Sequence, residues 1–178
     1  IQSAGQTCSA GSRLLVQESL YDKFMPMLAG RFSELQAGAA LMDLDLGPLI
    51  SDRQRTRVQD YLDEAESDGV PVIARGLVVD AAPKTGYYLA PVMLGPVPRA
   101  NRVASEEIFG PVLSVIPFED EADVIRLANS TVYGLTAGIW TKDGGRQMRV
   151  AKALKCGQVF INSYGAGGGV ELPFGGFK

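Results

Sequence analysis

The sequence contains no histidine among its 178 residues. This absence excludes Ser-His-Asp triads, Cys-His dyads and histidine-ligated metal sites built from this chain alone. We therefore expect no metal, and any nucleophilic chemistry here must use a base other than imidazole.

Cysteines, long apolar runs and excess positive charge are scarce as well. Two cysteines do not make a disulfide framework, which favours a reducing compartment and a cytoplasmic location. Apolar runs such as residues 112–117 are too short to cross a bilayer, and no basic stretch precedes an apolar one as in a signal peptide. The net charge of −3 argues against a nucleic-acid or anionic-membrane partner.

What is present is the composition of a globular protein, with 46% hydrophobic and 21% charged residues. Strand signals alternate with helix signals along the chain. Residues 14–16 are a short apolar run and 87–94 are β-prone; strands are expected at 70–74, 112–118, 136–141 and 159–162, and helices at 19–35, 51–68, 119–129 and 143–154. This alternation predicts an α/β fold with parallel strand pairing, and the absence of a linker predicts a single domain over 1–178.

Several residues carry local predictions. Ser19 is expected to cap the first helix, and Pro26 to kink it or to remove one of its hydrogen bonds. Ser51 and Gln54 form a capping-box pattern at the start of the second helix. Pro91 argues against a central position for the β-prone stretch around it.

Cys8 is the first candidate for chemistry. Its small, polar neighbours, which include Thr7 and Ser9, would let a substrate approach the sulfur. A short helix beginning at Cys8 would favour the thiolate and would offer N–H groups to a developing oxyanion. The alternative is a buried structural thiol, the commoner role of a free cysteine. Cys156 has no comparable setting, and we interpret it as a packing residue.

Residues 106–111 are the second candidate, because two acids and an aromatic precede a rigid Gly-Pro break and an apolar strand. Ligands gather at strand ends in α/β sheets, where a carboxylate can accept hydrogen bonds from ribose. The residue types alone favour an acidic surface loop. The arginines at 53, 55 and 57 do not share one face, so a solvated helix surface is the default interpretation.

The glycine-rich stretch 165–169 and the following residues 173–176 lack the strand and helix flanks of a phosphate-binding loop. A loop near a site and a plain connector remain equal alternatives for this stretch.

Six segments, taken together and in order, resemble the aldehyde dehydrogenase superfamily over essentially all of the chain. They are GQTCSAGSR at 5–13, GPLIS at 47–51, GYYLAP at 86–91, EEIFGP at 106–111, YGLTAG at 133–138 and LPFGGFK at 172–178. The resemblance implies the catalytic domain of that family, an α/β fold with a doubly wound, mostly parallel sheet.

The resemblance also implies roles for individual residues. Cys8 would be the nucleophile, Glu107 would bind the nicotinamide ribose, and Phe109 would pack beside the nicotinamide. Gln54 and Arg57 match positions that approach the cofactor ribose, although an arginine stands where a lysine is common.

For the substrate side, the resemblance implies a pocket that includes Thr7, Ser9 and Phe174. The implied partner is a small-molecule aldehyde, the cofactor is NAD or NADP, and the assembly is a homo-oligomer. The implied reaction is attack of the thiolate on the aldehyde, hydride transfer to NAD(P)+ and hydrolysis of a thioester by a glutamate-activated water.

In the family, the oxyanion asparagine, the glutamate base and most of the dinucleotide-binding domain precede the cysteine loop, and an oligomerisation segment follows the last motif. We therefore expect this chain to be a part of the catalytic domain and to be inactive in isolation. Two alternatives stay open: a non-catalytic packing or assembly module with the same fold, and a related acylating or phosphorylating semialdehyde dehydrogenase.

Overall fold

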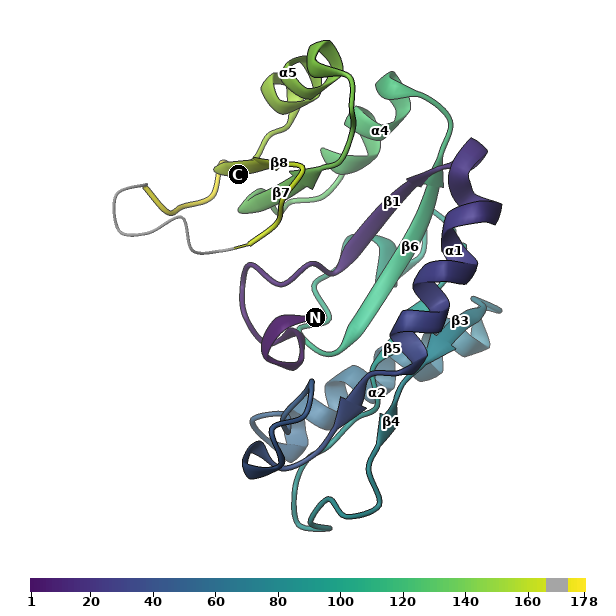
Figure 1. The fold of residues 1–178 in the computed structure, drawn as a ribbon, viewed down its shortest axis with the longest axis vertical. Helices are drawn as coiled ribbons and strands as arrows, with labels where there is room; N and C mark the ends of the chain where they lie inside the picture. The colour runs from purple at the N-terminus through teal and green to yellow at the C-terminus, as the bar shows by residue number, and fades with distance from the viewer. Residues whose placement is uncertain (166–172) are drawn as a thin grey trace. The chain divides into compact units, whose positions relative to one another are not determined.

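The computed structural model describes residues 1–165 and 173–178, and the chain divides into two compact units, Ile1–Pro117 and Phe118–Lys178 (Figure 1). The single domain expected over 1–178 stays a prediction, and each unit is described by itself. No helix in the described ranges is both long enough and apolar enough to cross a membrane.

The first unit contains most of the regular structure. Its helical elements are η1 (Gln2–Gly5), α1 (Glu18–Ser33), η2 (Ala40–Met42), α2 (Asp52–Ser67) and α3 (Arg102–Ser105). Its strands are β1 (Arg13–Gln17), β2 (Gln36–Ala37), β3 (Val72–Arg75), β4 (Leu77–Val78), β5 (Val92–Leu94) and β6 (Val112–Phe118).

Four of these strands form one sheet in the order β1-β6-β5-β3, and β2 pairs with β4 separately. The β5–β6 and β2–β4 pairs are parallel, whereas β3 runs antiparallel to β5 with an irregularity between Val72 and Ala74. The expected α/β class with mostly parallel pairing is therefore confirmed.

Strand β5 lies at the centre of the core. Met93 packs in a cluster with Met25 and Phe32 of α1, so its side chain faces that helix. Val92 and Leu94 are also buried, and because side chains alternate along a strand they face the opposite side of the sheet. Figure 1 shows α1 in front of this sheet and α2 behind it, an arrangement that requires a strand buried on both faces.

Strand β5 also corrects the expectation about Pro91. The strand begins at Val92, directly after the proline, and pairs with β3 on one side and β6 on the other. Because Pro91 precedes the paired residues, its missing N–H removes no hydrogen bond from the ladder. Its carbonyl still accepts a hydrogen bond from the Gly76 N–H at 2.9 Å.

Helix α2 follows the sequence pattern in its start, its apolar face and its end. The Ser51 hydroxyl accepts a hydrogen bond from the Gln54 N–H at 3.2 Å. The buried residues are those expected from the helical spacing, Val58, Tyr61, Leu62 and Ala65. Gly69, with φ 75°, follows the helix. The capping box is only half formed: among the described residues the Ser51 N–H makes no return bond to the Gln54 side chain, whose amide group donates to the Ile108 and Phe109 carbonyls.

The expected cap of α1 is wrong. The helix begins at Glu18, its N-cap position is Gln17, and no side chain caps it. Ser19 lies inside the first turn, because β1 ends at Gln17 and the chain enters the helix without an intervening loop. Pro26 lies within the helix, which runs to Ser33.

The second unit contains α4 (Glu121–Ala128), β7 (Thr136–Ile139), α5 (Gly144–Ala153) and β8 (Gln158–Ile161). Strands β7 and β8 pair in parallel, with Thr136 opposite Gln158. Asp120 and Asp143 cap the two helices by accepting backbone N–H groups at 2.9 Å. The glycine-rich stretch 165–169 lies outside the described residues except for Gly165.

Candidate functional site

Cys8 lies in an exposed turn between η1 and β1. The turn is closed by a hydrogen bond from the Ala10 N–H to the Thr7 carbonyl at 2.8 Å. Ser9 is buried, at 2% exposure, while Thr7 is half-buried. No helix begins at Cys8, so the helix-dipole argument for activating its thiol does not apply. The sulfur is accessible because Cys8 lies in an exposed turn.

The cysteine turn is packed against the 106–111 segment through two glycines. Gly5 has a φ of 74°, and a Cβ at this position would lie 1.9 Å from the carbonyl oxygen of Gly110. A Cβ on Gly110 would in turn lie 2.4 Å from Cγ2 of Val58 in α2. Glycine is therefore needed at both positions, because only a residue without a side chain permits this approach.

A small hollow lies between these two segments. Its lining residues come from both of them: Gly5, Thr7, Ala10, Gly11, Ser12, Glu107, Ile108, Phe109, Gly110 and Val112. Its volume of about 20 Å³ accommodates about one water molecule. The structure thus brings Glu107 and Phe109 beside the loop that carries Cys8.

Phe109 has an unusual backbone conformation. Its φ of 59° lies in the left-handed region, which bulky side chains seldom adopt. The side-chain amide of Gln54 donates to the Phe109 carbonyl at 2.8 Å and to the Ile108 carbonyl at 3.4 Å. Helix α2 therefore holds this strained segment through hydrogen bonds to main-chain carbonyls of the segment.

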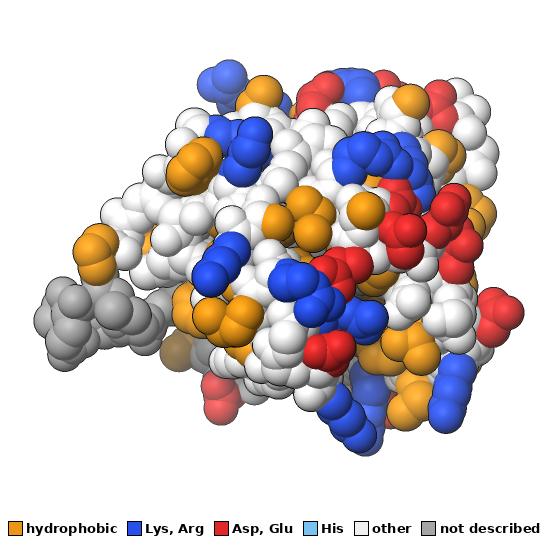
Figure 2. Space-filling model, turned by 90° about the horizontal axis from the view of Figure 1, so that it is seen from above, with side chains coloured by type: hydrophobic (Ala, Val, Ile, Leu, Met, Phe, Trp, Pro, Cys, Tyr) orange, Lys and Arg blue, Asp and Glu red, His pale blue; other side chains and the backbone are white. Residues whose placement is uncertain are grey.

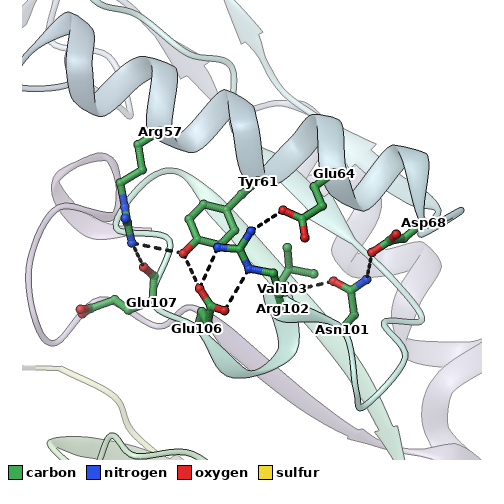
Figure 3. A network of polar contacts seen from close by, with 9 residues as sticks. All are labelled: Arg57, Tyr61, Glu64, Asp68, Asn101, Arg102, Val103, Glu106 and Glu107. Atoms are coloured by element: carbon green, nitrogen blue, oxygen red, sulfur yellow. Dashed lines mark hydrogen bonds and ion pairs between the residues drawn. The ribbon is translucent and has the colours of Figure 1, made fainter.

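Arg57, one turn further along α2, holds the adjacent carbonyl. Its guanidinium donates to the Glu107 carbonyl at 3.0 Å and to the Tyr61 hydroxyl at 3.2 Å. Figure 3 shows the Glu107 carboxylate pointing away from this network, although its carbonyl belongs to it. Gln54 and Arg57, both expected near the cofactor, thus contact the backbone beside the expected cofactor residues.

Glu106 lies on the other side of the segment, in a polar network (Figure 3). Its carboxylate accepts from the Tyr61 hydroxyl at 2.8 Å and from Arg102 at 2.9 and 3.0 Å, while Arg102 also pairs with Glu64. Arg102, followed by Tyr61, lowers the pKa of Glu106 to about 2. Burial, followed by the hydrogen bond to Glu106, raises the pKa of Tyr61.

Sequence reasoning missed this network. The four-residue spacing of Arg102 and Glu106 is a detectable signal, because it places the two side chains together on a helical turn. Tyr61 gives no such signal, since its place on the apolar face of α2 predicts burial only. Its hydroxyl reaches Glu106 from 45 residues away in the chain.

Gln6, next to the cysteine turn, was also missed. Its carbonyl oxygen accepts from the Ile50 N–H at 2.9 Å, and its amide donates to the Pro48 carbonyl at 3.4 Å. These bonds connect the cysteine segment to the loop that leads into α2. The motif around Cys8 and the motif at 47–51 are therefore parts of one local structure.

Phe174 belongs to the second unit, where it is 56% exposed. The neighbouring Pro173 carbonyl accepts a hydrogen bond from the Gln158 side chain at 3.1 Å.

Cys156 is half-buried, and burial raises the pKa of its thiol, as the packing interpretation requires. On the face shown in Figure 2, basic and acidic side chains lie next to one another among the described residues.

Comparison with known proteins shows to which family the chain belongs. The family model described as "Aldehyde dehydrogenase family" matches residues 1–178. The chain belongs to the aldehyde dehydrogenase family. The resemblance expected from the six motifs is confirmed.

Two curated relatives of this aldehyde dehydrogenase chain are similar over nearly all of its length. A betaine aldehyde dehydrogenase of Sinorhizobium fredii is 38% identical over 99% of the chain and 36% of the relative. An aldehyde dehydrogenase of Emericella nidulans is 40% identical over 98% of the chain and 34% of the relative. The chain thus spans about a third of the length of the curated relatives it matches.

Solved structures share the fold. A Burkholderia cenocepacia protein assigned to the aldehyde dehydrogenases is 55% identical, with a TM-score of 0.95 over 97% of this chain and 36% of that one. The betaine aldehyde dehydrogenase of Staphylococcus aureus, in complex with NAD+, is 38% identical, with a TM-score of 0.91 over 99% of this chain and 35% of that one.

Proposed function

We propose that this chain is the cysteine-bearing part of the catalytic domain of an NAD(P)-dependent aldehyde dehydrogenase that oxidises an aldehyde to a carboxylic acid. The observation that carries the proposal is the packing of the exposed Cys8 turn against the Glu107–Phe109 segment through Gly5 and Gly110. Family membership over the whole chain and the NAD+ complex of the Staphylococcus aureus relative support it.

The residues present fit a nicotinamide cofactor. The Glu107 carboxylate points away from the network that holds its carbonyl (Figure 3), and the two oxygens of a carboxylate can accept several hydrogen bonds, as from ribose hydroxyls. Phe109 is only half-buried and can cover one face of a flat ring. The chemistry that the bound nicotinamide supplies is the acceptance of a hydride from the substrate carbon.

The chain's own residues have defined tasks in this proposal. The Cys8 thiolate attacks the aldehyde carbonyl carbon, forming a carbon–sulfur bond and a thiohemiacetal. Loss of hydride from that carbon gives a thioester on Cys8. Addition of water releases the carboxylic acid and restores the thiol. Thr7, Ser9 and Phe174 are proposed to belong to the substrate pocket.

Two other functions share the same sulfur or the same fold. An acylating or phosphorylating semialdehyde dehydrogenase would pass the acyl group from Cys8 to an acceptor other than water. A non-catalytic packing module would leave Cys8 without a role. We favour aldehyde oxidation, with a homo-oligomeric assembly and a cytoplasmic location as parts of the proposal.

The test is aldehyde-dependent formation of NADH or NADPH by the full-length protein that contains this chain. Wild type and Cys156→Ala should be active, and Cys8→Ala should lose activity by several orders of magnitude because the covalent step requires the sulfur. Identification of the product separates free acid from an acyl-transfer product. A Cys8→Ala variant as active as wild type would overturn the proposal.

A further inference from the structure

We propose that Gln54 is a positioning residue, whose side-chain amide holds Phe109 in its left-handed backbone conformation and thereby sets how Glu107 and Phe109 present their side chains. This inference rests on the proposed function and deepens it, because it gives Gln54 a task other than contact with the cofactor ribose. The partner of Gln54 is the main chain of its own protein.

The conformation of Phe109 needs support from outside the segment. A φ of 59° costs free energy in a residue that carries a Cβ and an aromatic ring. Relaxation to a negative φ would require the neighbouring peptide groups to rotate, which would turn the Phe109 carbonyl away from α2. A donor fixed on α2 opposes that rotation.

Gln54 meets this requirement. Its Nε2 atom has two hydrogens and two acceptors, the Phe109 carbonyl at 2.8 Å and the Ile108 carbonyl at 3.4 Å. The side chain is half-buried and lies in the first turn of α2. The Ser51 cap fixes that turn through the N–H of the same Gln54 residue.

Arg57 extends the same support by one residue. Its guanidinium donates to the Glu107 carbonyl at 3.0 Å, so three consecutive carbonyls, at 107, 108 and 109, accept hydrogen bonds from two side chains of α2. Such a series holds the path of the backbone through main-chain atoms and uses neither the Glu107 nor the Phe109 side chain.

Direct contact with ribose is the competing role for Gln54, and the two roles predict different behaviour of an isosteric variant. Gln54→Glu keeps the shape of the side chain and an oxygen that can accept from a hydroxyl. It removes both donors and places a carboxylate against two carbonyl oxygens. Positioning therefore predicts a loss in Gln54→Glu, whereas acceptance of a ribose hydroxyl predicts little change.

The first experiment follows backbone hydrogen exchange in the full-length protein without cofactor or substrate. Exchange of the peptide covering residues 106–111 should become about tenfold faster in Gln54→Glu, because a local opening is made easier. Gln59→Leu is the matched control, since the exposed Gln59 lies on α2 and its amide donates to the Asp63 side chain at 2.7 Å, away from the 106–111 segment. Unchanged exchange in Gln54→Glu would overturn the proposal.

The second experiment measures the Kd for NAD+ by calorimetry in a double-mutant cycle with Phe109→Gly. Glycine adopts positive φ without strain, so it should remove the need for Gln54. In the protein that keeps Phe109, Gln54→Glu should weaken NAD+ binding about tenfold. In the Phe109→Gly background, the same substitution should weaken it by less than about twofold. An equal loss in both backgrounds, or little change in either, would overturn the positioning role.

A replacement variant and the cofactor-free experiment keep the test of Gln54 distinct from the test of the proposed function. If Gln54→Glu fails to fold, Gln54→Met removes the donors without adding charge and takes its place in both experiments. If the wild-type protein oxidises no aldehyde, the proposed function fails, while the hydrogen-exchange comparison still decides the role of Gln54.

Discussion

The α-carbon of Gly5 lies so close to the carbonyl of Gly110 that a methyl group on Gly5 would stand 1.9 Å from that oxygen. The two glycines are 105 positions apart, and they bring the cysteine turn against the segment that carries Glu107 and Phe109. The contact leaves no room for a side chain at Gly5.

Gly5→Ala should therefore destabilise the protein. The added Cβ clashes with the Gly110 carbonyl, and alanine is strained at a φ of 74°. Together these effects should cost roughly 2–4 kcal/mol of the free energy of unfolding. Urea unfolding followed by circular dichroism measures this loss.

Gly30→Ala is the matched control. Gly30 lies on the exposed side of α1, and its Cβ would meet no heavy atom within 4 Å. Alanine should stabilise this helix by about 0.5–1 kcal/mol. Equal unfolding midpoints for Gly5→Ala and wild type would show that the turn and the 106–111 segment separate without cost.

The course of most elements could be predicted from the sequence because local signals specify them. Apolar residues at helical spacing marked α2, and the four buried positions were those expected. The start of α1 was misplaced, since serine is a common cap and nothing in the local pattern shows that β1 runs directly into the helix. Strand β4 is two residues long, too short to produce a pattern.

The two cysteines should label at different rates. Cys8 is exposed, whereas Cys156 is half-buried and burial raises the pKa of its thiol, which lowers the fraction present as reactive thiolate. Reaction with Ellman's reagent should show a fast and a slow phase. Cys8→Ala should remove the fast phase and Cys156→Ala the slow one. Labelling of Cys8 only in denaturant would assign it to a structural role.

Acid should weaken the contact made by Glu106. Its pKa is about 2 in the folded protein against an ordinary value of 4.5, so the unfolded chain takes up a proton at a higher pH than the folded one. The stability from this group is therefore present above the ordinary value and is lost as the pH falls towards 2.

The comparison that tests this is Glu106→Gln against wild type. Between about pH 5 and about pH 3 the urea midpoint of wild type should fall more steeply than that of the variant, which lacks the titrating group. Glu121, whose pKa is also lowered to about 2 by Arg149 and Arg146, titrates equally in both proteins. Parallel curves would show that the Glu106 network contributes nothing to stability in this range.

Ser51→Ala should cost about 1 kcal/mol of stability, because the Gln54 N–H at the start of α2 would lose its acceptor. Ser67→Ala, at the exposed end of the same helix, is the control and should change stability by less than about 0.5 kcal/mol. Denaturant midpoints of the two variants provide the comparison. A larger loss in Ser67→Ala would contradict the cap.

The site was less predictable than the fold, for a physical reason. Motifs identified Cys8, Glu107 and Phe109, and the structure places the cysteine turn beside the other two. The bonds from Gln54 and Arg57 to main-chain carbonyls depend on the path of a segment 50 to 55 residues away, which residue types do not report. The hydrogen bonds between the Gln6 side chain and the backbone of Pro48 and Ile50 are unpredictable from the sequence for the same reason.

The hydrogen bonds from α2 are accepted by backbone carbonyl oxygens, which every amino acid carries. The side chains at 107 and 109 can therefore be exchanged by mutation while the hydrogen bonds from Gln54 and Arg57 persist. Substitutions at 107 and 109 could therefore be used to alter ligand binding while the hydrogen bonds that hold the backbone are kept.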